Sequence, residues 1–128
     1  MQRINVTTHA HSAMVNITGV VRQAVREMEI SEGVVTVFTP HTTCGLTINE
    51  NADPDVVSDF LRQLETMVPW HQPFYRHMEG NSAAHVKASL MGFSSCVIVE
   101  NGELQLGTWQ AIYLCEFDGP RTRTVFLK

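Results

Sequence analysis

The sequence predicts an α+β fold with a mainly antiparallel sheet, and two observations carry this prediction. Short strand-like runs follow one another across turn residues, whereas helical periodicity is confined to three separate segments. The last third of the chain is strand-like, and its Asn101-Gly102 pair is a strong signal for a tight hairpin. Strands joined by such short turns pair antiparallel, because a parallel pair needs a long crossover. We expect residues 1–128 to form one domain of this class.

The predicted strands are marked by alternation or by β-branched residues. Residues 4–8 alternate between apolar and polar side chains, as a half-buried strand does. Residues 34–39 form a β-branched run that ends at Pro40, and residues 44–48 alternate, so His41–Thr43 is the expected turn between two strands. The other strands are expected at Ser95–Val99, Leu104–Leu106, Thr108–Phe117 and Thr122–Leu127.

The first two predicted helices have recognisable starts. Thr18 is the expected N-cap of the first helix, whose apolar face repeats at helical spacing and ends before Ser31. Asp53-Pro54 starts the second helix, because the carboxylate accepts from free amides and proline at the first helical position loses no needed donor. This helix ends at Pro69.

The segment that follows is expected to be a long loop and then a short helix. Residues 70–81 show no periodicity, and a loop of about a dozen residues is often functional. An Ala-rich helix is expected over residues 82–90, with Asn81 or Ser82 as its cap and Gly92 as its stop.

The composition disfavours several classes of protein. The formal net charge of −4 and the isoelectric point near 5.8 argue against nonspecific binding to nucleic acid or to an anionic membrane. The N-terminus lacks the apolar stretch of a signal peptide, and no segment approaches the roughly 18 apolar residues of a membrane span. Cys44, Cys96 and Cys115 have no paired spacing, so neither a disulfide framework nor a cysteine-rich zinc site is expected. A cytoplasmic protein without nucleic-acid or membrane partners is favoured.

Three histidines are candidate ligands of a divalent metal ion, with zinc favoured and magnesium as the alternative. His41 lies in a predicted turn, where a solvated surface histidine is the other interpretation. His85 falls near the first turn of a predicted helix, where the helix dipole disfavours imidazolium. Neutral imidazole is the form that binds zinc and acts as a base. His77 can fold back to His85 across Gly80, so the three histidines are expected to converge on one site.

Acidic and amide side chains near the histidines are the candidate catalytic groups. Glu79 lies between His77 and His85, where a carboxylate can orient an imidazole or transfer a proton, the alternative being a solvated loop residue. Glu50 and Asn51 lie between a strand end and a helix start and have no evident structural duty.

Cys44 lies three residues after His41, which raises the possibility of a Cys–His nucleophile. Strand alternation instead places Cys44 on the same face as Leu46 and Ile48, toward the core. We therefore interpret it as a small buried hydrophobic residue.

Four further residues are candidates for substrate binding or charge stabilisation. Ser82 lies beside the histidine segment, and Trp109 with Gln110 enters a predicted strand after Gly107. Tryptophan beside glycine can form a pocket wall for a flat ring, the alternative being core packing. Arg121 can bind a phosphate or carboxylate with two hydrogen bonds, the alternative being a solvated turn residue.

Four features together resemble the YjbQ-like family of small proteins: HTTCGLTINENADPD, HMEGNSAAHVKASLMG, the Asn101-Gly102 hairpin and LGTWQAIYLCEFDGPR. The resemblance runs from Thr18 to Phe126, and the main departure is Cys44, where the family usually has a small residue such as alanine. It implies an antiparallel sheet bent into a half-barrel with flanking helices, assembled as a homotrimer. It also implies a polar pocket for a metal or an anion, with His41, His77 and His85 at the matching positions.

The resemblance implies a weak, secondary thiamine-phosphate synthase activity. That enzyme joins an aminopyrimidine diphosphate to a thiazole phosphate, so Arg121 and a metal would take up charge on the leaving group and Trp109 would stack on the pyrimidine. The sequence lacks an Asp-rich magnesium cluster for this reaction. The alternatives are a metal-dependent hydrolase, with Glu79 or Glu50 activating water, and a protein that binds a metal or a small phosphorylated molecule without catalysis.

Overall fold

The computed structural model of the chain describes residues 1–128 and contains eight strands and three helices. In chain order these are β1 (Gln2–Thr7), β2 (Ala13–Asn16), α1 (Thr18–Glu27), β3 (Gly33–Phe38), β4 (Cys44–Glu50), α2 (Pro54–Met67), α3 (Ser82–Met91), β5 (Ser94–Glu100), β6 (Glu103–Leu104), β7 (Gln110–Glu116) and β8 (Thr122–Leu127).

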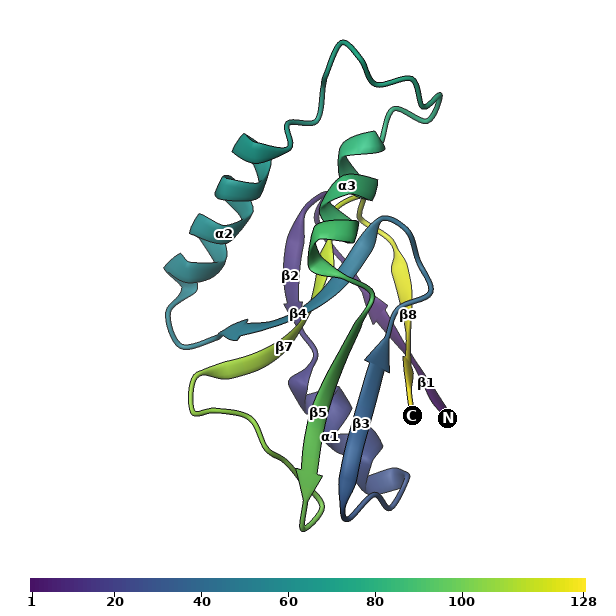
Figure 1. Cartoon of the computed structure of the whole chain (residues 1–128), viewed down its shortest axis with the longest axis vertical. Coiled ribbons are helices and arrows are strands. Elements are labelled where there is room, and N and C mark those ends of the chain that lie inside the picture. Colours follow the sequence, from purple (N-terminus) through teal and green to yellow (C-terminus); the bar gives the residue numbers. More distant parts are fainter.

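The strands form two antiparallel sheets that together curl into a half-barrel (Figure 1). The larger sheet has the order β1-β8-β3-β5-β6, and the smaller sheet has the order β2-β7-β4. Helices α2 and α3 lie at the upper end of the molecule in Figure 1, and α1 lies at the lower end. The α+β half-barrel with flanking helices predicted from the sequence is confirmed.

Both faces of strand β7 are buried, because the strand lies between two hydrophobic clusters. Ile112 and Leu114 contribute to a core of 16 buried residues that also includes the apolar face of α1. The alternate residues Ala111, Tyr113 and Cys115 belong to a second cluster of seven buried residues, formed with α2 and α3. The alternation of a strand thus gives β7 one face for each cluster.

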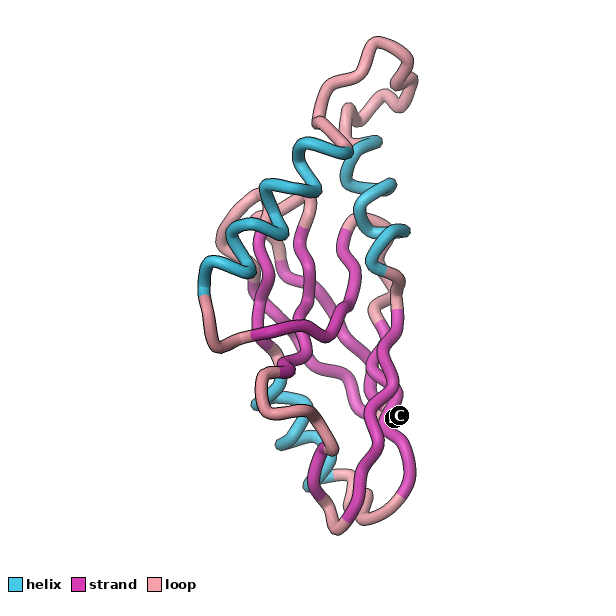
Figure 2. The backbone as a smooth tube through the Cα atoms, turned by 60° about the vertical axis from the view of Figure 1, so that its left-hand side comes forward, coloured by secondary structure: helices cyan, strands magenta, loops and turns pink.

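The long loop after α2 projects beyond the helices in both views (Figure 2). The two termini lie side by side, since β1 and β8 pair along their whole length and Gln2 is opposite Leu127. None of the three helices has the length and apolar character that crossing a membrane requires.

Two local predictions about turns and caps are confirmed. Asp53 caps α2, and its carboxylate accepts a 2.9 Å hydrogen bond from the backbone N–H of Asp55. Asn101 and Gly102 join β5 to β6 with φ angles of 52° and 75°. Both residues are left-handed, as the two-residue hairpin turn requires.

Of the other two predicted caps, the one of α1 was wrong, whereas α3 has one of its two predicted cap residues at the N-cap. Thr18 lies inside α1, and the side chain of Asn16 accepts hydrogen bonds from its N–H and hydroxyl instead. The Thr18 hydroxyl accepts from the N–H of Ile112, which ties α1 to β7. Asn81 occupies the N-cap position of α3 but makes no capping hydrogen bond with its side chain.

The connection between β3 and β4 also differs from the expectation. These strands belong to different sheets, so His41–Thr43 forms part of a crossover and not a hairpin turn. Strand β2 was not predicted, because it has four residues and none of its side chains is fully buried, which leaves little alternation to detect.

Candidate functional site

A polar pocket of about 430 Å³ opens where the two sheets approach the start of α3. Its walls come from the β3–β4 crossover, the end of the long loop, the start of α3, the β7–β8 turn and β8. Apart from Pro40, no aliphatic side chain lines it, and its only aromatic rings are those of histidines. The lining residues are Pro40, His41, Thr42, Thr43, His77, Glu79, Asn81, His85, Asp118, Arg121 and Arg123. The volume is that of a small-molecule site, but the polarity of the walls is unusually high for one.

His41 is fixed by a hydrogen bond that decides its protonation. Its Nε2 accepts a 2.9 Å bond from the backbone N–H of Thr124, so the lone pair of Nε2 is occupied. In neutral imidazole the other nitrogen then carries the proton. Burial lowers the pKa of His41 and the nearby charge of Arg123 lowers it further, which keeps the ring neutral at pH 7. His41, which lines the pocket, therefore carries its proton on Nδ1 and can act as a donor.

The structure brings His77 and His85 together, as the fold-back across Gly80 predicted. Their ring centroids lie 5.4 Å apart in an edge-to-face arrangement. Gly80 makes the turn with a φ of 71°, and its N–H donates to the carbonyl oxygen of His77 at 3.0 Å. Glu79 lies in the same turn, with Oε1 4.0 Å from Nε2 of His77. Ser82 lines a shallow depression beside this histidine pair.

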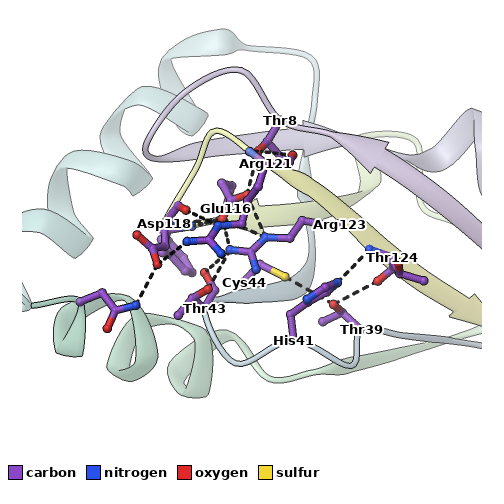
Figure 3. Close-up of polar contacts among 12 residues, drawn as sticks. Thr8, Thr39, His41, Thr43, Cys44, Glu116, Asp118, Arg121, Arg123 and Thr124 are labelled. Carbon is purple, nitrogen blue, oxygen red and sulfur yellow. Dashed lines mark hydrogen bonds and ion pairs between the residues drawn. The ribbon is translucent and has the colours of Figure 1, made fainter. Parts of the chain in front are cut away.

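Behind the pocket lies a buried ion pair between Glu116 of β7 and Arg123 of β8 (Figure 3). Glu116 is fully buried and accepts hydrogen bonds from Nε and Nη2 of Arg123 and from the hydroxyl of Thr8. Burial alone would raise the pKa of Glu116, but these hydrogen bonds outweigh it and lower the pKa. Arg123 also donates to the carbonyl and hydroxyl oxygens of Thr43, while its Nη1 makes no hydrogen bond within the chain.

The β7–β8 turn supplies a second guanidinium. Arg121 donates from Nε to the carbonyl oxygen of Asp118 at 2.7 Å and from Nη2 to the carboxylate of Asp118 at 2.9 Å. The same carboxylate oxygen accepts from the side-chain amide of Asn81 at 2.9 Å, which links the turn to the start of α3. Gly119 makes this turn possible, because a Cβ there would lie 2.2 Å from the carbonyl oxygen of Ala10.

The predicted three-histidine metal set does not fit this geometry. His41 lacks a free lone pair as long as Nε2 is bonded to Thr124, and an N–H donor cannot ligate a cation. No group of three or more His, Cys, Asp or Glu side chains is placed to hold a metal ion. The divalent ion, zinc or magnesium, therefore stays a prediction of the sequence, with only His77 and His85 adjacent to each other.

The other predicted site residues do not line the histidine pocket. Asn51 and Gln110 line a separate polar cavity of about 590 Å³ between the start of α1 and the segment before β7. The side chain of Gln110 is engaged there, accepting from the N–H of Gly107 at 2.8 Å. Glu50 contributes its carbonyl oxygen to a hydrogen bond from the hydroxyl of Tyr113. Trp109 is 61% exposed and lines neither cavity.

Cys44 has the core position that its alternation predicted. It is fully buried in the larger hydrophobic cluster, and its thiol contacts the hydroxyl of Thr39 at 3.4 Å. Burial raises the pKa of the Cys44 thiol, so the nucleophilic thiolate is disfavoured.

The sequence interpretation did not identify Asn81, Asp118, Arg123 and Thr43 as site residues. The sequence predicts Asn81 as a helix cap, and in the structure its side-chain amide donates to the carboxylate of Asp118. One sequence feature could have indicated the buried ion pair: an acidic residue, Glu116, and a basic residue, Arg123, lie on either side of the Gly119-Pro120 turn. Strand alternation cannot show that such a pair is buried, because the two residues belong to different sheets.

Fold and site together define a small half-barrel protein with a polar, arginine- and histidine-lined pocket. The family model described as "UPF0047 protein YjbQ-like" matches residues 2–128, and the chain belongs to the YjbQ/UPF0047 family. UPF0047 protein YugU of Bacillus subtilis is 52% identical over 128 residues, covering 100% of this chain and 97% of that protein. UPF0047 protein MJ1081 of Methanocaldococcus jannaschii is 42% identical, covering 98% of this chain and 91% of its own length.

Solved structures of similar proteins have the same fold. An uncharacterised conserved protein of the YjbQ/UPF0047 family from Clostridium acetobutylicum superposes with a TM-score of 0.97 at 52% identity, covering 100% of this chain and 98% of that one. The conserved hypothetical protein TT1486 from Thermus thermophilus gives a TM-score of 0.94 at 45% identity, covering 100% and 98% of the two chains.

Proposed function

We propose that the pocket binds a small phosphorylated molecule and that its phosphate lies against Arg121, Arg123 and His41. The observation that carries the proposal is the hydrogen bond from the Thr124 N–H to Nε2 of His41, because it makes the imidazole a donor. A donor suits an anion and is unsuited to a cation. The hydroxyls of Thr42 and Thr43 lie on the same stretch of the wall.

The two guanidinium groups support the same ligand. Their Nε and Nη2 atoms are fixed by Asp118 and Glu116, whereas neither Nη1 has a partner within the chain. Fixed guanidinium groups with free N–H donors are suited to phosphate oxygens, and their orientation is set before the ligand arrives.

The condensation that forms thiamine phosphate receives less support from this geometry. That reaction needs a surface for a flat pyrimidine, and Trp109, the residue expected to provide it, does not line the pocket. We therefore place phosphate-ligand binding first. The adjacent imidazoles of His77 and His85 in the pocket wall support a second candidate, a proton-transfer reaction on the bound molecule.

Isothermal titration calorimetry with inorganic phosphate tests the proposal. Arg121→Gln should weaken phosphate binding about 10- to 100-fold, since it removes charged hydrogen bonds worth about 1.5–3 kcal/mol. Arg62→Gln on the exposed side of α2 is the matched control and should bind like the parent. Equal affinity of Arg121→Gln and the parent would place the anion elsewhere. Turnover assays with the two thiamine precursors and with phosphoesters then distinguish an enzyme from a binding protein.

A further inference from the structure

The hydrogen-bonding groups of the pocket are divided between its two ends. Figure 3 shows His41 at one end of the cluster and Asp118 at the other, with Arg121, Arg123 and Thr43 between them. Beyond Asp118, toward α3, the lining groups are Asn81, Glu79 and the histidine pair. The His41 end therefore offers donors, whereas the end near α3 is rich in acceptors.

Asn81 links the two carboxylates at this end of the pocket. Its amide nitrogen donates to Asp118 at 2.9 Å and to Glu79 at 3.4 Å, so both carboxylates are held by the same side chain. Asn81 is 6% exposed, and its Oδ1 is buried without any donor. A buried carbonyl oxygen without a donor carries a cost in free energy. This oxygen has no accessible surface, so the acceptors that a ligand can reach at this end are the carboxylates of Glu79 and Asp118.

We infer that the ligand is a phosphomonoester of a polyol or sugar, with its hydroxyl groups directed toward Glu79 and Asp118. The inference rests on the proposed phosphate site, which fixes one end of the molecule. Hydroxyl groups can donate to carboxylate oxygens, and they need no wall of large apolar side chains, which this pocket lacks.

The charges favour a neutral donor over an ammonium group. Asp118 already forms an ion pair with Arg121 at 2.9 Å, so its charge is compensated within the chain. An ammonium group in the pocket would approach Arg121 and Arg123, and like charges repel. A hydroxyl group satisfies the same acceptors without this repulsion.

Calorimetry on the full chain with three probes tests the inference: inorganic phosphate, sorbitol 6-phosphate and phenyl phosphate. Sorbitol 6-phosphate should bind about tenfold more tightly than the other two, because its hydroxyl groups form additional hydrogen bonds to the carboxylates near α3. Equal binding of sorbitol 6-phosphate and phenyl phosphate would overturn the polyol inference but leave the phosphate site standing. Failure of all three probes to bind would overturn the phosphate site itself.

A variant identifies the end of the pocket that binds the hydroxyl groups. Glu79→Gln should weaken sorbitol 6-phosphate about tenfold and slightly strengthen inorganic phosphate, because it removes an acceptor and a negative charge. Glu103→Gln on the exposed β5–β6 hairpin is the matched control and should change neither affinity. If Glu79→Gln lowers both affinities by the same factor, the hydroxyl groups do not lie near Glu79. Far-UV circular dichroism verifies that each variant is folded.

Discussion

Removal of the Glu116 charge should destabilise the protein strongly, because it leaves Arg123 buried without a counter-ion. Glu116→Gln keeps the size of the side chain but places an NH₂ group where one carboxylate oxygen accepts hydrogen bonds. Only 2% of the Arg123 side chain is exposed, so water cannot replace the lost partner. Breaking a buried pair by removing one member costs about 3–5 kcal/mol.

The expected change in melting temperature follows from the length of the chain. At about 2.1 cal/mol/K per residue, 128 residues give an unfolding entropy of about 270 cal/mol/K. A loss of about 3–5 kcal/mol then lowers Tm by about 11–19 °C. Urea unfolding followed by circular dichroism at pH 7 measures the free energy, and scanning calorimetry measures Tm. Glu103→Gln, an exposed control, should change stability by less than about 0.5 kcal/mol.

The loss of stability caused by Glu116→Gln should also depend on pH. The pKa of Glu116 is lowered in the folded protein from its ordinary value of 4.5, since hydrogen bonds to the carboxylate outweigh its burial. A lowered carboxyl pKa contributes stability that is complete above the unfolded pKa and is lost as the pH falls through the folded pKa. The difference in stability between the parent and Glu116→Gln should therefore be constant near neutral pH and shrink as the pH falls below 4.5. A loss under about 1 kcal/mol at pH 7 would refute this account of the buried pair.

Four further predictions concern the site, the core and the assembly. Long-range ¹H–¹⁵N NMR should find His41 as the Nδ1–H tautomer at pH 7, with a pKa below 6.5; an Nε2–H tautomer would contradict the bond to Thr124. Cys44→Ala should leave phosphate binding intact and cost about 1 kcal/mol in urea unfolding, and loss of binding would argue for a functional thiol. Gly119→Ala should cost about 1–3 kcal/mol through its clash with a backbone oxygen, whereas Gly19→Ala, which meets no atom within 4 Å, should be neutral or stabilising. We propose a homotrimer, so light scattering should give three times 14.3 kDa, and a monomer at micromolar concentration would contradict it.

The sequence predicts features that depend on residues close together in the chain. It predicts less well the features that depend on how the strands pair into two sheets. The cap at Asp53, the Asn101-Gly102 turn and the approach of His77 to His85 each need only a few consecutive residues. All three are present in the structure. The split of the strands into two sheets was not predicted, because alternation identifies a strand without identifying its partners.

The candidate site shows the same limit. Glu50, Asn51 and Gln110 are polar and lie near strand ends, as His41 does, but nothing in their local pattern says which end of the half-barrel they occupy. Pairing of β4 with β7 places Glu50 opposite Gln110, whereas the other end of the same pair, Cys44 opposite Glu116, lies near the histidine pocket. His41, at one end of this strand pair, therefore lines the histidine pocket, whereas Asn51 and Gln110, at the other end, line the second cavity.

The position of His41 has a physical cause in the strand pairing. Strand β3 pairs with β8 only through Val37 and Phe38, and it ends there. The backbone groups of Thr124, further along β8, therefore have no strand partner on that side. The side chains that follow β3 replace it: the Thr39 hydroxyl donates to the Thr124 carbonyl oxygen at 3.4 Å, and His41 accepts from its N–H. The unpaired N–H of Thr124 at this sheet edge thus fixes the tautomer of His41, because it must donate to Nε2. With Nε2 occupied, Nδ1 carries the proton and is the donor that we propose for an anion.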